Sequence, residues 1–170
     1  MSELFLIVLA RAVHVMAGVA WAGAMFVMAV VVVPLASRHA EQGAGRWLGM
    51  VVQRAGQLSG ISAMLTVLSG IYLFAVLHAH DDSASGLVLK AGAVAAVVSM
   101  VLGIVVGRRT GMELVRLEAE NPTDAAATAA RAARLATLRS RAKLSTRLTA
   151  ALLGFAVLSM AVFRYATALV

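Results

Sequence analysis

The chain has 170 residues, of which 61% are hydrophobic and 14% are charged. A soluble domain has about 25% charged residues, so this composition excludes an ordinary soluble globule. The sequence contains no cysteine, which excludes disulfides, thiolate metal sites and covalently attached c-type haem. A metal ion or haem would therefore need histidine, methionine, lysine, tyrosine or carboxylate ligands.

Four apolar segments are each long enough for the roughly 20 residues of a membrane-spanning helix. None of them alternates with a period of two, and only helices or closed barrels satisfy the backbone in lipid. We therefore predict an all-α fold, an integral membrane four-helix bundle that forms one domain over residues 1–170. The predicted spans are residues 4–34, 56–78, 87–107 and 148–168.

The first predicted helix begins near Ser2, a residue type that caps helices, and runs to Pro34. It is longer than a bilayer requires, so it must tilt or emerge at one end. Its apolar run exceeds the ~7–15-residue core of a cleaved signal peptide, and we expect it to be retained. Residues 37–54 include three glycines and predict a short loop before the second span.

The remaining connections predict two antiparallel pairs of helices. Residues 80–86 are few, so the second and third spans should form a hairpin. The third helix continues beyond Gly107 to a turn in which Thr123 or Asp124 caps an alanine-rich helix that leads into the fourth span. We expect residues 108–147 to form a helical hairpin outside the membrane, either a solvated stalk or a docking surface for a partner or a second copy.

The net charge of +7 arises mainly in the first and third connections between spans. Because cytoplasmic loops are enriched in lysine and arginine, this bias places both connections in the cytoplasm and both termini outside. We expect the basic excess to contact lipid headgroups and not nucleic acid. The basic residues concerned are Arg38, Arg46 and Arg54, and then Arg108, Arg109, Arg116, Arg131, Arg134, Arg139, Arg141, Lys143 and Arg147.

His14 is the strongest candidate site residue because it lies inside a long apolar span, where ionisable groups are costly and by default functional. Arg11, His14, Gly18 and Trp21 share one face of a helix. A glycine one turn from a histidine leaves room for a planar macrocycle or for another backbone, and a neutral imidazole can be an axial haem ligand. The alternative is that His14 only hydrogen-bonds a serine or threonine across the bundle.

Other ionisable residues collect at the same end of the predicted bundle, namely His78, His80, Lys90 and Arg164. Arg11, Lys90 and Arg164 are candidates to pair with haem propionates, and His78 or His80 is a candidate second ligand. His14, His78 and His80 alternatively form a candidate copper site. The simpler alternative is that the two outer histidines are solvated and that Lys90 and Arg164 snorkel outwards.

The pattern His14-x6-Trp21-x-Gly23 in a first membrane helix resembles small four-helix proteins related to the bacterial copper-resistance protein CopD and to HemJ-like protoporphyrinogen oxidases. It is also similar to the membrane portion of a cytochrome-c-coupled urate oxidase. Lys90 resembles a lysine that HemJ-like proteins carry near the start of a later helix. The resemblance implies a haem- or porphyrin-associated redox protein with His14 and Lys90 as site residues. HemJ-like proteins have an arginine where this chain has Leu35.

The leading hypothesis is therefore a multi-pass protein of the bacterial inner (cytoplasmic) membrane that binds haem b or a related porphyrin. It would transfer electrons, or oxidise a porphyrin, against a quinone or a redox partner protein, with the cofactor supplying the chemistry. A copper-handling protein and a structural membrane subunit without a cofactor are the alternatives, and a homo-oligomer is compatible with each. No motif of a hydrolase or an ATPase is present.

Overall fold

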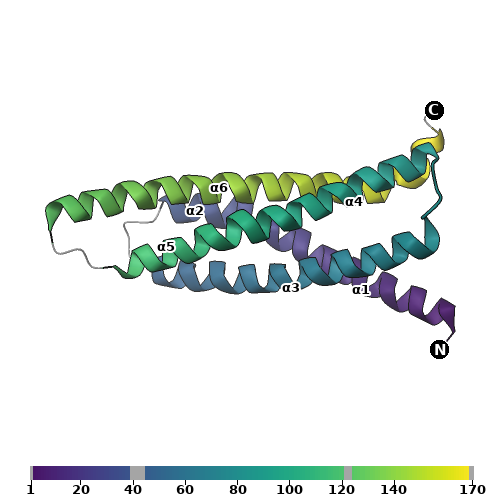
Figure 1. The fold of residues 1–170 in the computed structure, drawn as a ribbon, viewed down its shortest axis with the longest axis horizontal. Coiled ribbons are helices and arrows are strands. Elements are labelled where there is room, and N and C mark those ends of the chain that lie inside the picture. Colours follow the sequence, from purple (N-terminus) through teal and green to yellow (C-terminus); the bar gives the residue numbers. More distant parts are fainter. Residues whose placement is uncertain (1, 39–44, 121–123, 169–170) are drawn as a thin grey trace.

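The computed structural model describes residues 2–38, 45–120 and 124–168, and all regular elements in these ranges are helical, as predicted (Figure 1). The elements are α1 (Glu3–Val27), a π-helical turn η1 (Met28–Val32), α2 (Val33–Arg38), α3 (Gly45–Leu77), α4 (Ala84–Leu102), a second π-helical segment η2 (Gly103–Arg108), α5 (Arg109–Ala119), α6 (Ala125–Val162) and a final 3₁₀ segment η3 (Phe163–Ala168).

Four helical runs are long and apolar enough to cross a membrane, and they overlap all four predicted spans. Several of these runs contain more than one element, because the π-helical segments η1 and η2 change the backbone hydrogen-bond pattern without ending the helix. The runs are Glu3–Leu35, Met50–Leu77, Ala84–Ala119 and Ala125–Ala166.

The predicted loop over residues 37–54 is wrong in its second half, because α3 begins at Gly45. A glycine inside a helix costs only about 1 kcal/mol relative to alanine. Extending a long helix by further turns costs far less than starting a new one, so the glycines of this stretch do not end α3. Residues 37–38 of the predicted loop are also helical, since they belong to α2, and residues 39–44 lie outside the described residues.

The four runs form two pairs, in which α1 crosses α3 and α4 lies antiparallel to α6 (Figure 1). The pairs meet at a core of mostly small residues around Trp21, which is 4% exposed. Gly92 shows how close the helices approach, since a Cβ there would lie 2.8 Å from the Cβ of Ser159. Small residues allow such close packing in membrane bundles. The buried core consists of Trp21, Ala63, Ala95, Ala96, Leu153 and Ala156.

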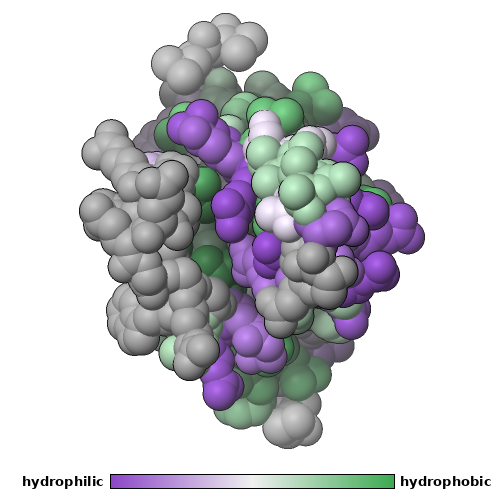
Figure 2. Space-filling view, turned by 90° about the vertical axis from the view of Figure 1, so that its left-hand side faces the viewer, coloured by the Kyte–Doolittle hydropathy of each residue, from purple (hydrophilic) through white to green (hydrophobic). Residues whose placement is uncertain are grey.

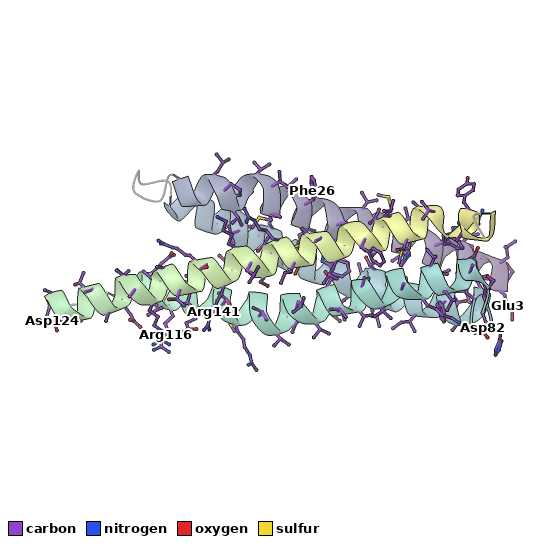
Figure 3. All side chains as sticks on the ribbon, turned by 90° about the horizontal axis from the view of Figure 1, so that it is seen from above. Glu3, Phe26, Asp82, Arg116, Asp124 and Arg141 are labelled. Atoms are coloured by element: carbon purple, nitrogen blue, oxygen red, sulfur yellow. The ribbon has the colours of Figure 1, made fainter. Side chains whose placement is uncertain are left out.

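Beyond the apolar runs, α5 packs against the first half of α6 through a separate cluster of leucines. Arg131 fastens the two helices by donating hydrogen bonds to the backbone carbonyls of Leu117 and Glu118. Asp124 caps α6, because its carboxylate accepts a hydrogen bond from the backbone of Ala127 at 2.6 Å. Figure 2 views this end of the molecule and shows hydrophilic side chains gathered on it, and Figure 3 shows α6 extending past α2 towards Asp124.

Candidate functional site around His14

His14 lies on α1 at the point where this helix crosses α3, and its ring is half-buried between them. Its Nδ1 lies 2.8 Å from the backbone carbonyl oxygen of Thr66. A carbonyl oxygen can only accept a hydrogen bond, so Nδ1 must carry the proton. The hydroxyl of Ser69 lies 3.4 Å from the same nitrogen. In a neutral imidazole, this contact selects the Nδ1–H tautomer, which leaves the Nε2 lone pair available to a ligand.

Two glycines allow this contact between the helices. A Cβ on Gly70 would lie 2.8 Å from Cε1 and 3.1 Å from Nδ1 of His14, so the imidazole occupies the space that a side chain would fill. A Cβ on Gly18 would lie 3.6 Å from Cγ2 of Thr66. The side chain of Thr66 on the neighbouring helix thus lies beside Gly18.

Hydroxyl groups continue along α3 from the histidine towards the other end of the bundle. Thr66, Ser62 and Ser59 are all buried on this helix. The Thr66 hydroxyl donates to the carbonyl of Ser62 at 2.7 Å, which satisfies it within its own helix. Among the described residues, Ser59 carries the one buried side-chain oxygen without a hydrogen-bond partner.

Thr66, Ser69 and Gly70 are the site residues that sequence reasoning missed. The signal was present, because the second span is rich in small and hydroxyl residues. Which of them meets His14 depends on how α1 and α3 are aligned, and a periodic pattern within one helix does not contain that information.

The rest of the predicted helix face divides between the core and the surface. Trp21 is buried in the core where the two helix pairs meet. Arg11 lies three residues before His14, on the same side of α1, and is exposed. Among the described residues, Arg11 has no partner in a hydrogen bond or an ion pair. Nε2 of His14 likewise has no hydrogen-bond partner among them.

The other predicted residues gather at the end of the bundle near the α3–α4 connection, as topology suggested. Lys90 Nζ lies 2.7 Å from the carboxylate of Asp82. His78 packs edge-on against Phe163, with the ring centroids 5.8 Å apart. The guanidinium of Arg164 lies 5.9 Å from the centre of the same phenyl ring. These groups therefore have partners of their own.

Asp81 completes this outer cluster. A hydrogen bond from the Ser83 hydroxyl at 2.6 Å, helped by the Ser83 backbone and by the nearby His78 and Lys90, lowers the pKa of the Asp81 carboxyl. Its Oδ2 lies 3.8 Å from Nδ1 of His78. The contacts of this cluster connect the start of α4 to the end of α3, so the cluster has a structural role.

The structure does not bring His14 to the outer histidines. His78 directly follows the end of α3 and lies eight residues beyond Gly70, which corresponds to about 12 Å along the helix axis. Among the residues that the structure describes, no three histidine, aspartate or glutamate side chains lie close enough to hold a metal ion. His14, His78 and His80 thus do not form one metal-binding group in the described part of the chain.

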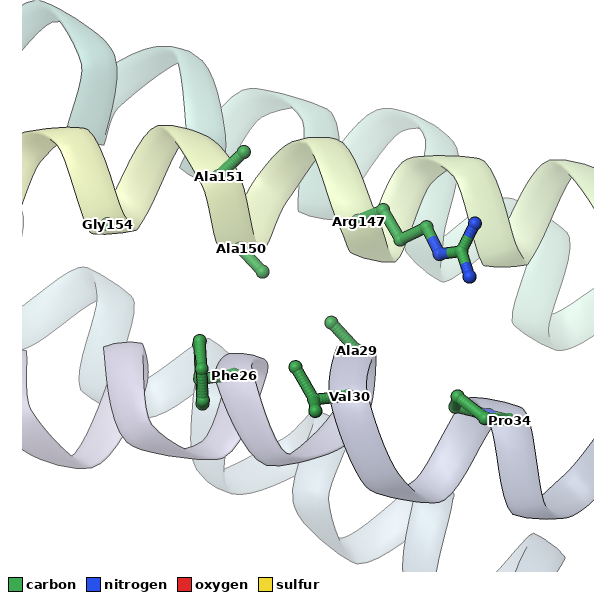
Figure 4. Close-up of a pocket in the computed structure, with 8 residues that line it drawn as sticks. All are labelled: Phe26, Ala29, Val30, Pro34, Arg147, Ala150, Ala151 and Gly154. Atoms are coloured by element: carbon green, nitrogen blue, oxygen red, sulfur yellow. The ribbon is translucent and has the colours of Figure 1, made fainter.

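A groove with a volume of about 530 Å³ lies elsewhere, between the first helical run and α6 (Figure 4). It is apolar except for one arginine. Its lining residues are Phe26, Ala29, Val30, Pro34, Arg147, Ala150, Ala151 and Gly154.

Comparison of the chain with models of protein families, with curated proteins and with solved structures gave no match.

Proposed function

We propose that this chain is an integral membrane redox protein that binds haem b or a related porphyrin through Nε2 of His14. The observation that supports this proposal is the 2.8 Å contact between His14 Nδ1 and the Thr66 carbonyl. Histidines that ligate a metal almost always donate their other ring N–H to a carbonyl or carboxylate. That bond fixes the tautomer, orients the ring and makes Nε2 a better ligand.

Each residue around His14 would make a different contribution to binding the haem or porphyrin. Gly70 leaves the space in which the ring stands, and the Thr66 carbonyl holds its orientation. Arg11, exposed and one turn towards the N-terminus, offers a charged donor to a propionate. When bound, the cofactor would supply one-electron transfer or porphyrin oxidation, coupled to a quinone or to a partner protein. Lys90 and Arg164, which we predicted as propionate contacts, have other partners and are left out of this site.

The orientation belongs to the same proposal. The basic α5–α6 end would face the cytoplasm of a bacterium, with both termini and the Asp81–Lys90 cluster on the outer side of the inner membrane. In this orientation His14 would lie in the outer half of the bundle.

The test is the visible spectrum of the detergent-purified protein, expressed with a haem precursor and recorded oxidised and after reduction with dithionite. A single histidine ligand predicts a Soret band with the broad reduced bands of a five-coordinate haem. His14→Ala should abolish the Soret band. A Soret band that persists in His14→Ala would refute the assignment of the ligand, and a colourless wild-type protein would refute haem binding.

His14→Asn separates the ligand role from a packing role. The amide nitrogen of asparagine occupies the position of histidine Nδ1, so it keeps the donor to the Thr66 carbonyl but has no Nε2. We expect His14→Asn to lose the Soret band while it unfolds like the wild type. If His14 only fastens α1 to α3, the alanine variant should lose about 0.6 kcal/mol of stability, the average for hydrogen bonds between membrane helices, and no pigment should be present in any form.

A further inference from the structure

The groove shown in Figure 4 lies at the end of the bundle away from the His14 site, where the apolar part of α6 begins. Ala150, Ala151 and Gly154 form its wall on α6 and leave it wide because they are small. Phe26 and Val30 form the opposite wall. The groove thus runs between two helices that are each apolar enough to span a membrane, and it is open to the surface of the bundle.

Arg147 is the one charged residue in this groove. It is the last cation before α6 becomes continuously apolar, so it lies at the level where a lipid headgroup would be. Its side chain is exposed and extends along α6 away from Gly154 (Figure 4). No residue in the described part of the chain accepts a hydrogen bond or forms an ion pair with Arg147.

The charges of the neighbouring segment show why this arginine differs from those farther out. Near the tip, Arg116 pairs with Glu120, Arg134 with Glu113, and Arg139 with Glu118, so the far part of the α5–α6 pair neutralises itself. Closer to the apolar runs, five cations have no acidic partner within the described ranges, and we call them the base cluster. The base cluster consists of Arg108, Arg109, Arg141, Lys143 and Arg147.

We infer that the groove binds one anionic phospholipid, with its phosphate at Arg147 and one acyl chain along Ala150, Ala151 and Gly154. A volume of about 530 Å³ is in the usual range of ligand sites, and its lining suits a hydrocarbon chain. Basic pockets between membrane helices are known to select anionic headgroups. A soluble anion would use the arginine but not the apolar wall. This inference does not depend on a cofactor at His14.

The experiment measures lipid retention by native mass spectrometry of the full-length, delipidated protein. The probes are phosphatidylglycerol and phosphatidylcholine with identical acyl chains, added in equal amounts. We expect one phosphatidylglycerol to be retained preferentially. Arg147→Gln should lower its retention by about fivefold to tenfold. The matched control is Arg141→Gln, which removes a base-cluster charge outside the groove and should change retention by less than about twofold.

Two further variants test the acyl-chain part of the site. Ala151→Leu and Gly154→Leu fill the groove while Arg147 remains, and each should reduce phosphatidylglycerol retention as strongly as Arg147→Gln. Ala161→Leu adds the same bulk at an exposed position of α6 outside the groove and should have no effect. Millimolar inorganic phosphate should not displace the lipid.

Three results would overturn the inference. Equal losses in Arg141→Gln and Arg147→Gln would indicate a diffuse attraction to the basic end. Unchanged retention in both leucine variants would show that the groove holds no acyl chain. Equal retention of the two lipids would show that the arginine does not select the headgroup.

Discussion

Gly70→Ala should break the contact between His14 and α3, because the added methyl carbon would lie 2.8 Å from Cε1 and 3.1 Å from Nδ1 of the imidazole. Carbon atoms in good contact are about 3.5–4.0 Å apart, so the ring must move by roughly 0.7 Å or more. Such a shift stretches the 2.8 Å hydrogen bond to Thr66 beyond useful length.

The expected loss of stability follows from three terms. Overpacking costs about 1–3 kcal/mol, and the weakened hydrogen bond costs about 0.6 kcal/mol. The higher helix propensity of alanine returns about 1 kcal/mol. We therefore expect Gly70→Ala to lower the free energy of unfolding by about 0.6–2.6 kcal/mol.

The assay is reversible unfolding in mixed micelles with increasing sodium dodecyl sulfate, followed by circular dichroism. The matched control is Gly60→Ala on the same helix, where a Cβ would meet nothing within 4 Å. That control should be neutral or up to about 1 kcal/mol more stable. If Gly70→Ala behaves like Gly60→Ala, the close contact between His14 and α3 is refuted.

The remaining predictions concern the other pair of helices and the outer cluster. Gly92→Ala would place a methyl group 2.8 Å from Cβ of Ser159, so it should separate α4 from α6 and cost about 1–3 kcal/mol relative to the Gly60→Ala control in the same unfolding assay, whereas no loss relative to that control would contradict this packing. Because the Ser83 hydroxyl lowers the pKa of Asp81 in the folded protein, the ionised carboxylate stabilises the fold above the ordinary aspartate pKa of about 3.9 and this contribution is lost as the pH falls through the lowered value. The difference in Tm between wild type and Asp81→Asn should shrink as the pH falls below about 3.9, and a difference independent of pH would contradict the assignment.

Much of the helical architecture could be predicted from the sequence, because long apolar runs admit few structures in lipid. All four predicted spans fall largely within helices of the structure. The cap at Asp124 and the continuous helix that follows it also could be predicted, since an acidic cap followed by an alanine-rich run is a strong local signal. The start of α3 at Gly45 was missed because isolated glycines break the apolar pattern of a sequence, although they destabilise a helix only slightly.

Only the part of the site that lies on α1 was predicted from the sequence. Helical periodicity places His14, Gly18 and Trp21 on one face, and this face does turn towards the other helices. Periodicity does not show what each residue meets, however. Trp21 lies in the core and Lys90 pairs with Asp82, and the helical pattern alone predicts neither contact. These outcomes depend on the relative shift of whole helices, which only the tertiary structure gives.

The division of the bundle into α1 with α3, and α4 with α6, follows the order of the chain. Each half is a contiguous segment with two membrane-spanning runs, and the short connection from His78 to Ser83 is the one link that crosses from the first half to the second. Each pair can therefore complete its own closest contacts as soon as its second run has been synthesised. Later joining of the two halves involves mainly the surface around Trp21. A chain cut within residues 79–82 and produced as two co-expressed fragments should thus reassemble in the membrane, because no helix pair is divided by the cut.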